Sequence, residues 1–186
     1  TKCPPSSTGI GNRFRAPNPP SAAPLLVWTD ASYALLGERL EEPTADCDAA
    51  MGAVVYDPVD GAFYHTERTV TRSELLRLFN PHVQYIGVLE NEAAASAALS
   101  FPELFAGRLV IHFVDNQGAL ANLVSGCSRD PDCARIVHES ALDTSSLRAR
   151  VWYEYVPSKA NIADLPSRGD FSFEIRELAA CSELFD

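Results

Sequence analysis

The sequence predicts an α/β fold: a mixed five-stranded sheet, three antiparallel strands followed by parallel ones, flanked by helices. Three observations predict it. Five segments are apolar runs, or alternate apolar and polar residues, over the length of a strand. The first three follow one another without a helical segment, which favours an antiparallel meander. A helical segment precedes each of the last two, as the crossover to a parallel strand requires.

The first three predicted strands form a continuous group. Residues 25–29 are an apolar run that ends at Asp30. Residues 50–56 make the second strand, and an Asp-Gly turn connects it to an alternating segment over 63–70. This spacing predicts that the second and third strands form a hairpin.

Two helices are predicted before the fourth strand. Residues 73–79 can form a short helix with Ser73 as its N-cap. Residues 88–99 are rich in alanine and glutamate, which have high helix propensity. Pro102 is expected to end this second helix.

The second half of the chain alternates strands and helices. Residues 108–114 are an apolar run that again ends at an acid, Asp115. Asn116 is expected to cap a helix that runs through Val124 and ends at Gly126. The remaining predicted elements are a helix over about 132–142, a strand over 150–156 and a closing helix over 171–185.

The remaining segments are the ends and connections of the chain. Residues 1–24 are rich in proline and polar residues and are predicted to be a disordered or extended linker, so the folded domain is expected to span 25–186. The acidic stretch 37–48 is expected to be a solvated loop. The five scattered cysteines match neither a disulfide framework nor a zinc site. We see no membrane span or signal peptide and expect an intracellular protein, cytoplasmic or nuclear.

The formal net charge of −10 argues against a broad basic surface for nucleic acid. An acidic metal site would contribute several of these charges, and bound cations would offset them. Any contact with nucleic acid must therefore be local, or be supplied by a covalently linked neighbour.

Four carboxylates are candidates for a metal site. Asp30 and Asp115 directly follow predicted strands, and the rim of an α/β sheet is where ligands bind. Glu90 lies near the start of the alanine-rich helix, and Asp164 lies just beyond the last strand. Such a cluster would repel strongly without a cation, and oxygen ligands are those that Mg²⁺ or Mn²⁺ prefers.

Four blocks, in this order along the chain, resemble the ribonuclease H domains of retroelement reverse transcriptases, such as those of retrotransposons and pararetroviruses. They are Leu-Val-Trp-Thr-Asp-Ala-Ser at 26–32, Ile-Gly-Val-Leu-Glu-Asn-Glu-Ala at 86–93, Phe-Val-Asp-Asn-Gln-Gly at 113–118, and Asn-Ile-Ala-Asp-Leu-Pro-Ser-Arg at 161–168. The resemblance implies a ribonuclease H-like fold and hydrolysis of the RNA strand of RNA–DNA hybrids. It also implies a polymerase domain as partner.

The resemblance further implies roles for individual residues. Two Mg²⁺ ions, with Mn²⁺ as a possible substitute, would be held by Asp30, Glu90, Asp115 and Asp164, with Asp30 as the bridging ligand. The sequence context favours Glu90 over Glu92. Contacts with the 2′-hydroxyl groups of the substrate would come from the backbone around Ala31 and Ser32 and from Asn116 and Gln117. Lys159 could contact a phosphate or simply be solvated. Asn116 has the helix cap as an equally good explanation.

The sequence departs from this family in several places. No histidine occurs in 156–161, where the family often carries one shortly before the last aspartate. The basic, tryptophan-bearing segment of some cellular members has no counterpart, and Trp152 is expected to be a core residue. A proofreading exonuclease would show a glutamate in place of Ser32. The alternative in a different class is a non-catalytic ribonuclease H-fold scaffold or nucleic-acid-binding module.

Overall fold

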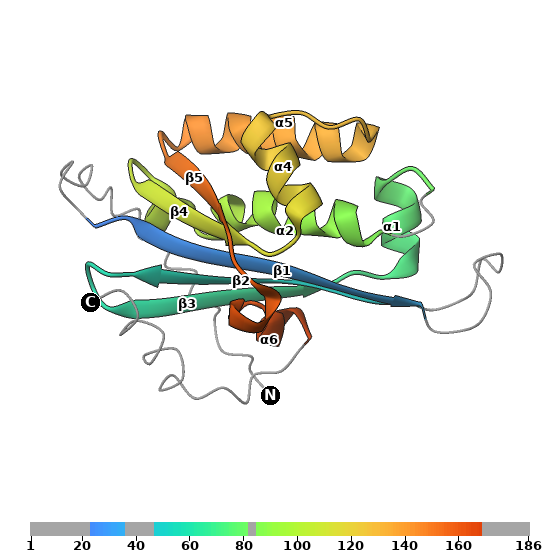
Figure 1. Ribbon diagram of the computed structural model, residues 1–186, viewed down its shortest axis with the longest axis horizontal. Coiled ribbons are helices and arrows are strands. Elements are labelled where there is room, and N and C mark those ends of the chain that lie inside the picture. The colour runs from blue at the N-terminus through green and yellow to red at the C-terminus, as the bar shows by residue number, and fades with distance from the viewer. Residues whose placement is uncertain (1–22, 36–46, 82–84, 169–186) are drawn as a thin grey trace, which may run out of the picture.

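The computed structural model describes residues 23–35, 47–81 and 85–168 (Figure 1). The predicted linker lies outside these residues except for its last two positions. Most of the acidic loop and the whole predicted closing helix also lie outside them.

The described residues contain one mixed sheet of five strands in the order β3-β2-β1-β4-β5. β1 pairs antiparallel with β2, and β2 with β3, whereas β4 runs parallel to both β1 and β5. This confirms the predicted sheet. The strands are β1 (Leu25–Leu35), β2 (Cys47–Asp57), β3 (Ala62–Thr69), β4 (Leu109–Val114) and β5 (Arg150–Tyr155).

Helices cover the two faces of the sheet unequally. Figure 1 shows α2, α4 and α5 on one side and the short α6 on the other. The helices are α1 (Arg72–Leu78), α2 (Ile86–Ser100), α3 (Pro102–Phe105), α4 (Gln117–Ser125), α5 (Pro131–Ser146), the 3-10 turn η1 (Ser158–Ala160) and α6 (Asp164–Ser167). None of them is long and apolar enough to cross a membrane.

The ends of the helices follow local chemistry. Thr71, and not Ser73, caps α1: its hydroxyl accepts from the Glu74 amide, and the Glu74 carboxylate accepts from the Thr71 amide. This reciprocal pair satisfies two backbone donors, where a serine cap two residues later would satisfy one. Asn116 and Gly126 bound α4 as predicted, with Gly126 left-handed at φ 69°. Pro102 begins α3 directly after α2 has ended at Ser100.

The core lies between the sheet and α2. Leu25 and Val27 point from β1 toward α2 and are fully buried together with Ala97. The alanines of α2 have small side chains, so the helix packs closely over β1 and β2. This packing fixes the position of Glu90, which lies on the same helix.

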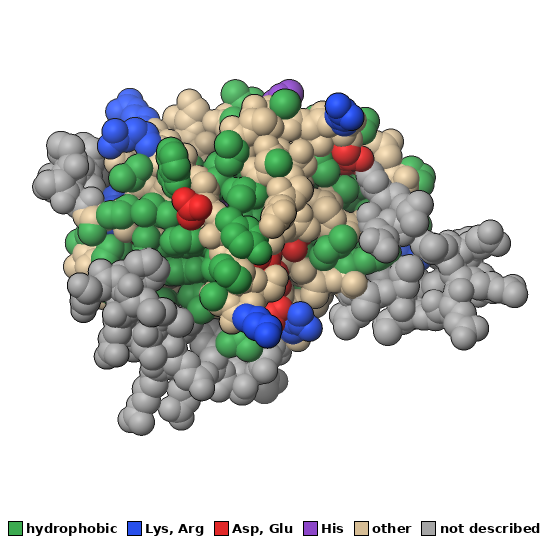
Figure 2. Space-filling view, viewed as in Figure 1, with side chains coloured by type: hydrophobic (Ala, Val, Ile, Leu, Met, Phe, Trp, Pro, Cys, Tyr) green, Lys and Arg blue, Asp and Glu red, His purple; other side chains and the backbone are tan. Residues whose placement is uncertain are grey.

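The expectation that Trp152 is a core residue is wrong. Its side chain is 64% exposed, because β5 is an edge strand and Trp152 lies beside Ile111 on the face away from the large helices. Figure 2 shows hydrophobic side chains gathered on the visible face of the molecule. Trp28, in contrast, is buried and stacks on Phe113 with ring centroids 5.1 Å apart.

Candidate metal centre

Strand register brings two of the predicted acids together. The parallel pairing of β1 with β4 ends at Thr29 and Val114. Asp30 is the next residue of β1 and Asp115 follows the last residue of β4, so the two acids lie close together where β4 ends. β1 itself does not end at Asp30, because β2 continues to pair with it as far as Leu35. The continuing β1–β2 ladder holds the backbone around Asp30 rigidly.

Asp30, Glu90 and Asp115 form a carboxylate cluster. One oxygen from each lies within 4.8 Å of the others. Asp30 and Glu90 are 5% and 4% exposed, whereas Asp115 is partly exposed. The cluster is therefore buried at its base and open at the Asp115 side.

Burial and mutual repulsion change the acidity of this carboxylate cluster. The pKa of Asp30 is raised to about 6: burial is the largest cause, the charges of Asp115 and Asp164 add to it, and a hydrogen bond from Ser167 opposes it. The pKa of Glu90 is raised to about 9, mainly by burial and also by repulsion from Asp30 and Asp115. Glu90 therefore holds a proton at neutral pH unless a cation compensates its charge.

The cluster meets the requirements of a hard divalent cation. All its donors are carboxylate oxygens, which Mg²⁺, Mn²⁺ and Ca²⁺ accept as ligands. Glu90 Oε2 is buried and has no hydrogen-bond partner among the residues that the structure describes. A buried oxygen without a partner is costly in a folded protein, and a cation would remove that cost. Asp30, Glu90 and Asp115 could thus bind a metal ion.

Asp164 stands beside this cluster. It lies in α6, and its Oδ1 accepts a hydrogen bond from Arg168 Nε at 2.7 Å. Its charge contributes to the raised pKa of Asp30, so it is close enough to interact with that carboxylate. Among the described residues, however, the group within 4.8 Å consists of the other three acids.

The structure brings Glu90, and not Glu92, into the cluster. Two residues along a helix are about 200° apart around its axis. Burial raises the pKa of Glu92, and the charges that act on it are those of Arg135, Arg68 and Glu139. Glu92 therefore faces a different part of the molecule.

The five candidate substrate residues have different surroundings. The Ser32 hydroxyl donates to Ser167 O at 2.6 Å, and the backbone of Ala31 donates to the Glu90 carboxylate. The Asn116 carboxamide oxygen accepts from the amides of Gly118 and Ala119, so it caps α4. The two that expose their side chains to solvent are Gln117 and Lys159.

Three further residues support the site and were assigned no role from the sequence. Asn161 donates from Nδ2 to Thr29 O at 2.9 Å, and Ser167 donates from Oγ to Asp30 Oδ2. Both lie in the block at 161–168 that resembles the family, and this resemblance could have indicated a role for them. Gly52 allows α6 to approach β2, since a Cβ there would lie 2.5 Å from Ser167 N. A lone glycine inside a strand carries no such signal.

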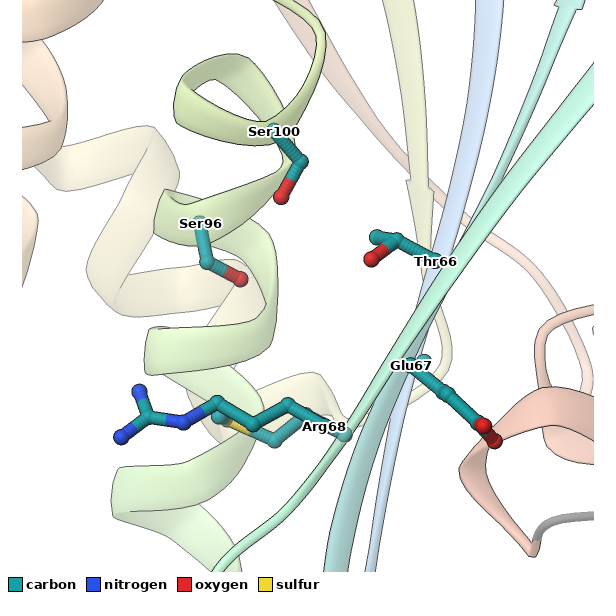
Figure 3. A pocket seen from close by; sticks show the side chains of 7 residues that line it. Thr66, Glu67, Arg68, Ser96 and Ser100 are labelled. Atoms are coloured by element: carbon teal, nitrogen blue, oxygen red, sulfur yellow. The ribbon is translucent and has the colours of Figure 1, made fainter. Parts of the chain in front are cut away.

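The described residues also line cavities outside the carboxylate cluster. One of about 220 Å³ lies between β3 and α2, lined by Thr66, Arg68, Ser96 and Ser100 among others, and Figure 3 shows Glu67 pointing away from it. Another, of about 430 Å³, is mainly apolar. Its lining includes Trp28, Phe113, Lys159, Asn161, Asp164 and Leu165.

Comparison with known proteins supports the fold. The sequence matches no protein-family model and no curated protein. The ribonuclease H1 of Halobacterium salinarum matches with a TM-score of 0.56 and 18% identity, over 77% of this chain and 94% of that one. The N-terminal ribonuclease H domain of a Mycobacterium tuberculosis protein, solved as a fusion with maltose-binding protein, matches with a TM-score of 0.58 and 17% identity, over 87% and 99%.

A third solved structure is LC11-RNase H1 in complex with an RNA/DNA hybrid. It matches with a TM-score of 0.56 and 14% identity, over 83% of this chain and 99% of that one. The chain therefore has a ribonuclease H-like fold, and that fold carries an acidic cluster that could bind metal.

Proposed function

We propose that this chain is a Mg²⁺-dependent endonuclease that hydrolyses the RNA strand of RNA–DNA hybrids by a two-metal mechanism. One observation carries the proposal. Three carboxylates converge within 4.8 Å on a ribonuclease H-like sheet, and one of their buried oxygens has no hydrogen-bond partner in the described part of the chain. This arrangement is costly for a scaffold and useful for a metal-dependent hydrolase.

Each acid has a place in this proposal. Asp30 would bridge two cations, Glu90 and Asp115 would each hold one, and Asp164 would complete the set after exchanging Arg168 for a cation. When bound, Mg²⁺ or Mn²⁺ supplies an activated water and stabilises the leaving oxygen. The residues themselves fix the ligand geometry and keep the base of the site buried.

The substrate and partners belong to the same proposal. Hybrid contacts are assigned to the five candidates Ala31, Ser32, Asn116, Gln117 and Lys159. The net charge of −10 favours a domain that depends on a linked polymerase, as in a retroelement reverse transcriptase inside the cell. The structural relative that was solved with an RNA/DNA hybrid supports the substrate.

The test is cleavage of a labelled hybrid by the purified chain with Mg²⁺, with double-stranded RNA and DNA as parallel substrates. We expect cleavage of the RNA strand of the hybrid alone, and its loss in Asp30→Asn, which keeps the shape of the side chain but removes its charge. Undiminished cleavage by a folded Asp30→Asn protein would refute the assignment.

The alternative is a non-catalytic module of the same fold. The observation that favours it is the ion pair between Asp164 and Arg168, because the fourth candidate metal ligand is already neutralised by an arginine. Hybrid binding without cleavage under Mg²⁺ or Mn²⁺ would support this alternative.

A further inference from the structure

Ser167 lies at the end of α6, is fully buried, and contacts Asp30 of the carboxylate cluster. Its Oγ donates a hydrogen bond to Asp30 Oδ2 across 137 positions of sequence. We propose that Ser167 is a positioning residue that orients the Asp30 carboxylate for cation binding. This inference deepens the proposed function and rests on it.

The hydroxyl has two acceptors within reach. Asp30 Oδ2 is the nearer, and the backbone O of Asp164 lies at 3.0 Å. A hydroxyl carries one proton, and a charged carboxylate is the stronger acceptor. The proton therefore goes to Asp30, and the contact with Asp164 is the ordinary one that a serine makes to the preceding turn.

The segment that carries Ser167 is tied to β1 on both sides of Asp30. Asn161 Nδ2 donates to Thr29 O at 2.9 Å, and the Ser32 hydroxyl donates to Ser167 O at 2.6 Å. Three bonds thus join 161–167 to Thr29, Asp30 and Ser32 of β1. The position of Ser167 relative to Asp30 is set by this attachment rather than by the α6 helix alone.

Close packing of α6 on β2 completes the attachment. A Cβ on Gly52 would lie 2.5 Å from Ser167 N and 3.0 Å from the carbonyl carbon of Pro166. Gly52 pairs with Asp30 in the β1–β2 ladder. The absence of a side chain opposite Asp30 is therefore what lets the Ser167 hydroxyl reach the carboxylate.

The consequence for cation binding follows from repulsion within the cluster. Asp30 is surrounded by the like charges of Asp115 and Asp164, which disfavour a fixed orientation when no cation is present. A hydrogen bond to Oδ2 favours one rotamer of the Asp30 side chain. Preorganised ligands bind more tightly because less conformational entropy is lost on binding.

The experiment measures Mg²⁺ and Mn²⁺ binding by isothermal titration calorimetry on the full chain without nucleic acid. Ser167→Ala is expected to weaken binding about three- to tenfold, the range for loss of one hydrogen bond. Ser167→Thr, which keeps the hydroxyl, is expected to recover most of the affinity. The matched control is Ser140→Ala, a buried serine on α5, which is expected to leave cation affinity unchanged.

Cleavage kinetics supply a second measurement. The Mg²⁺ concentration for half-maximal cleavage is expected to rise in Ser167→Ala, while KM for the hybrid stays unchanged because the hydroxyl does not touch substrate. If Ser167→Ala does not fold, Ser167→Cys replaces it, since a thiol has similar size but donates poorly. Affinity in Ser167→Ala or Ser167→Cys equal to that of the wild type would overturn the proposal, as would failure of Ser167→Thr to recover affinity.

Failure of this inference is distinguishable from failure of the proposed function. A wild-type chain that binds neither cation contradicts the metal centre itself, and with it this inference. A wild-type chain that binds and cleaves normally, with Ser167→Ala binding equally well, leaves the endonuclease in place and removes the role of Ser167 alone.

Discussion

At the scale of single residues, the site combines charge with burial. Glu90 is 4% exposed and has a raised pKa, and its Oε2 has no hydrogen-bond partner within 23–35, 47–81 and 85–168. His112 shows the contrasting case. Burial lowers its pKa to about 3, and its Nε2 shares a 2.9 Å hydrogen bond with Thr29 Oγ1, so it is a neutral structural residue. A buried carboxylate such as Glu90 can serve a function where a bound cation compensates its charge.

Arg108 and Asp57 form a fully buried ion pair whose loss can be measured. The guanidinium donates to both oxygens of Asp57 at 3.0 and 2.9 Å, and the two side chains are 1% and 0% exposed. We expect Asp57→Ala to cost about 3–5 kcal/mol in unfolding free energy, because an uncompensated charge stays buried. Equilibrium unfolding in denaturant measures this change in unfolding free energy.

The control for this prediction is the exposed pair of Arg135 with Glu139, at 3.0 Å. Glu139→Ala is expected to cost less than about 1 kcal/mol, because solvent screens an exposed pair. Equal losses in the two variants would contradict the importance of burial.

At the scale of elements, the short helix α6 connects the carboxylate cluster to the sheet. It carries Asp164 and Ser167 and packs on β1 and β2. Its four residues are too few to be stable as an isolated helix. Its position therefore depends on contacts with the sheet, and the closest of these passes over Gly52.

Gly52→Ala tests this close approach. The new methyl would lie 2.5 Å from the backbone of Ser167, so α6 must shift, and we expect a loss of about 1–3 kcal/mol together with weaker cation binding. Gly87→Ala is the matched control, since a Cβ there meets nothing within 4 Å and alanine favours a helix. It is expected to be neutral or stabilising. Equal stability of the two variants would show that α6 does not press on β2.

At the scale of the whole molecule, the acidic cluster makes stability depend on pH and on cations. Asp30 and Glu90 have pKa values of about 6 and about 9, above their ordinary values of 3.8 and 4.5. Both groups therefore bind protons more tightly in the folded protein. Their contribution to stability is complete below about pH 4 and is lost as pH rises through 6 and then 9.

This linkage predicts that the melting temperature in EDTA falls between about pH 5 and pH 9, and that Mg²⁺ restores it most at the alkaline end. Glu90→Gln, which stays neutral, should be more stable than the wild type in EDTA at pH 8 and should gain less from Mg²⁺. Thermal melts at several pH values measure both effects. A pH-independent melting temperature with no response to Mg²⁺ would contradict the linkage.

Much of the fold could be predicted because its signals are local. The alternation and length of apolar runs gave strand identity, and Asn116 and Gly126 marked the ends of α4 through cap chemistry. The predicted N-cap of α1 was wrong because Thr71 and Ser73 both suit that position. The predicted burial of Trp152 was wrong because burial depends on which elements pack beside a strand. Trp152 is exposed because β5 lies at the edge of the sheet, which no property of the residue itself reveals.

What the sequence by itself determined is the five strands, the longer helices between them, the order of these elements, and the acids that flank them. The sequence context favours Glu90 over Glu92, but only the tertiary structure brings an oxygen of Glu90 within 4.8 Å of Asp30 and Asp115. The tertiary structure also decided that Ser167 reaches Asp30 above Gly52. The physical reason is range, since propensity and capping act over a few residues, whereas the electrostatics of the site arise between groups that only packing brings together.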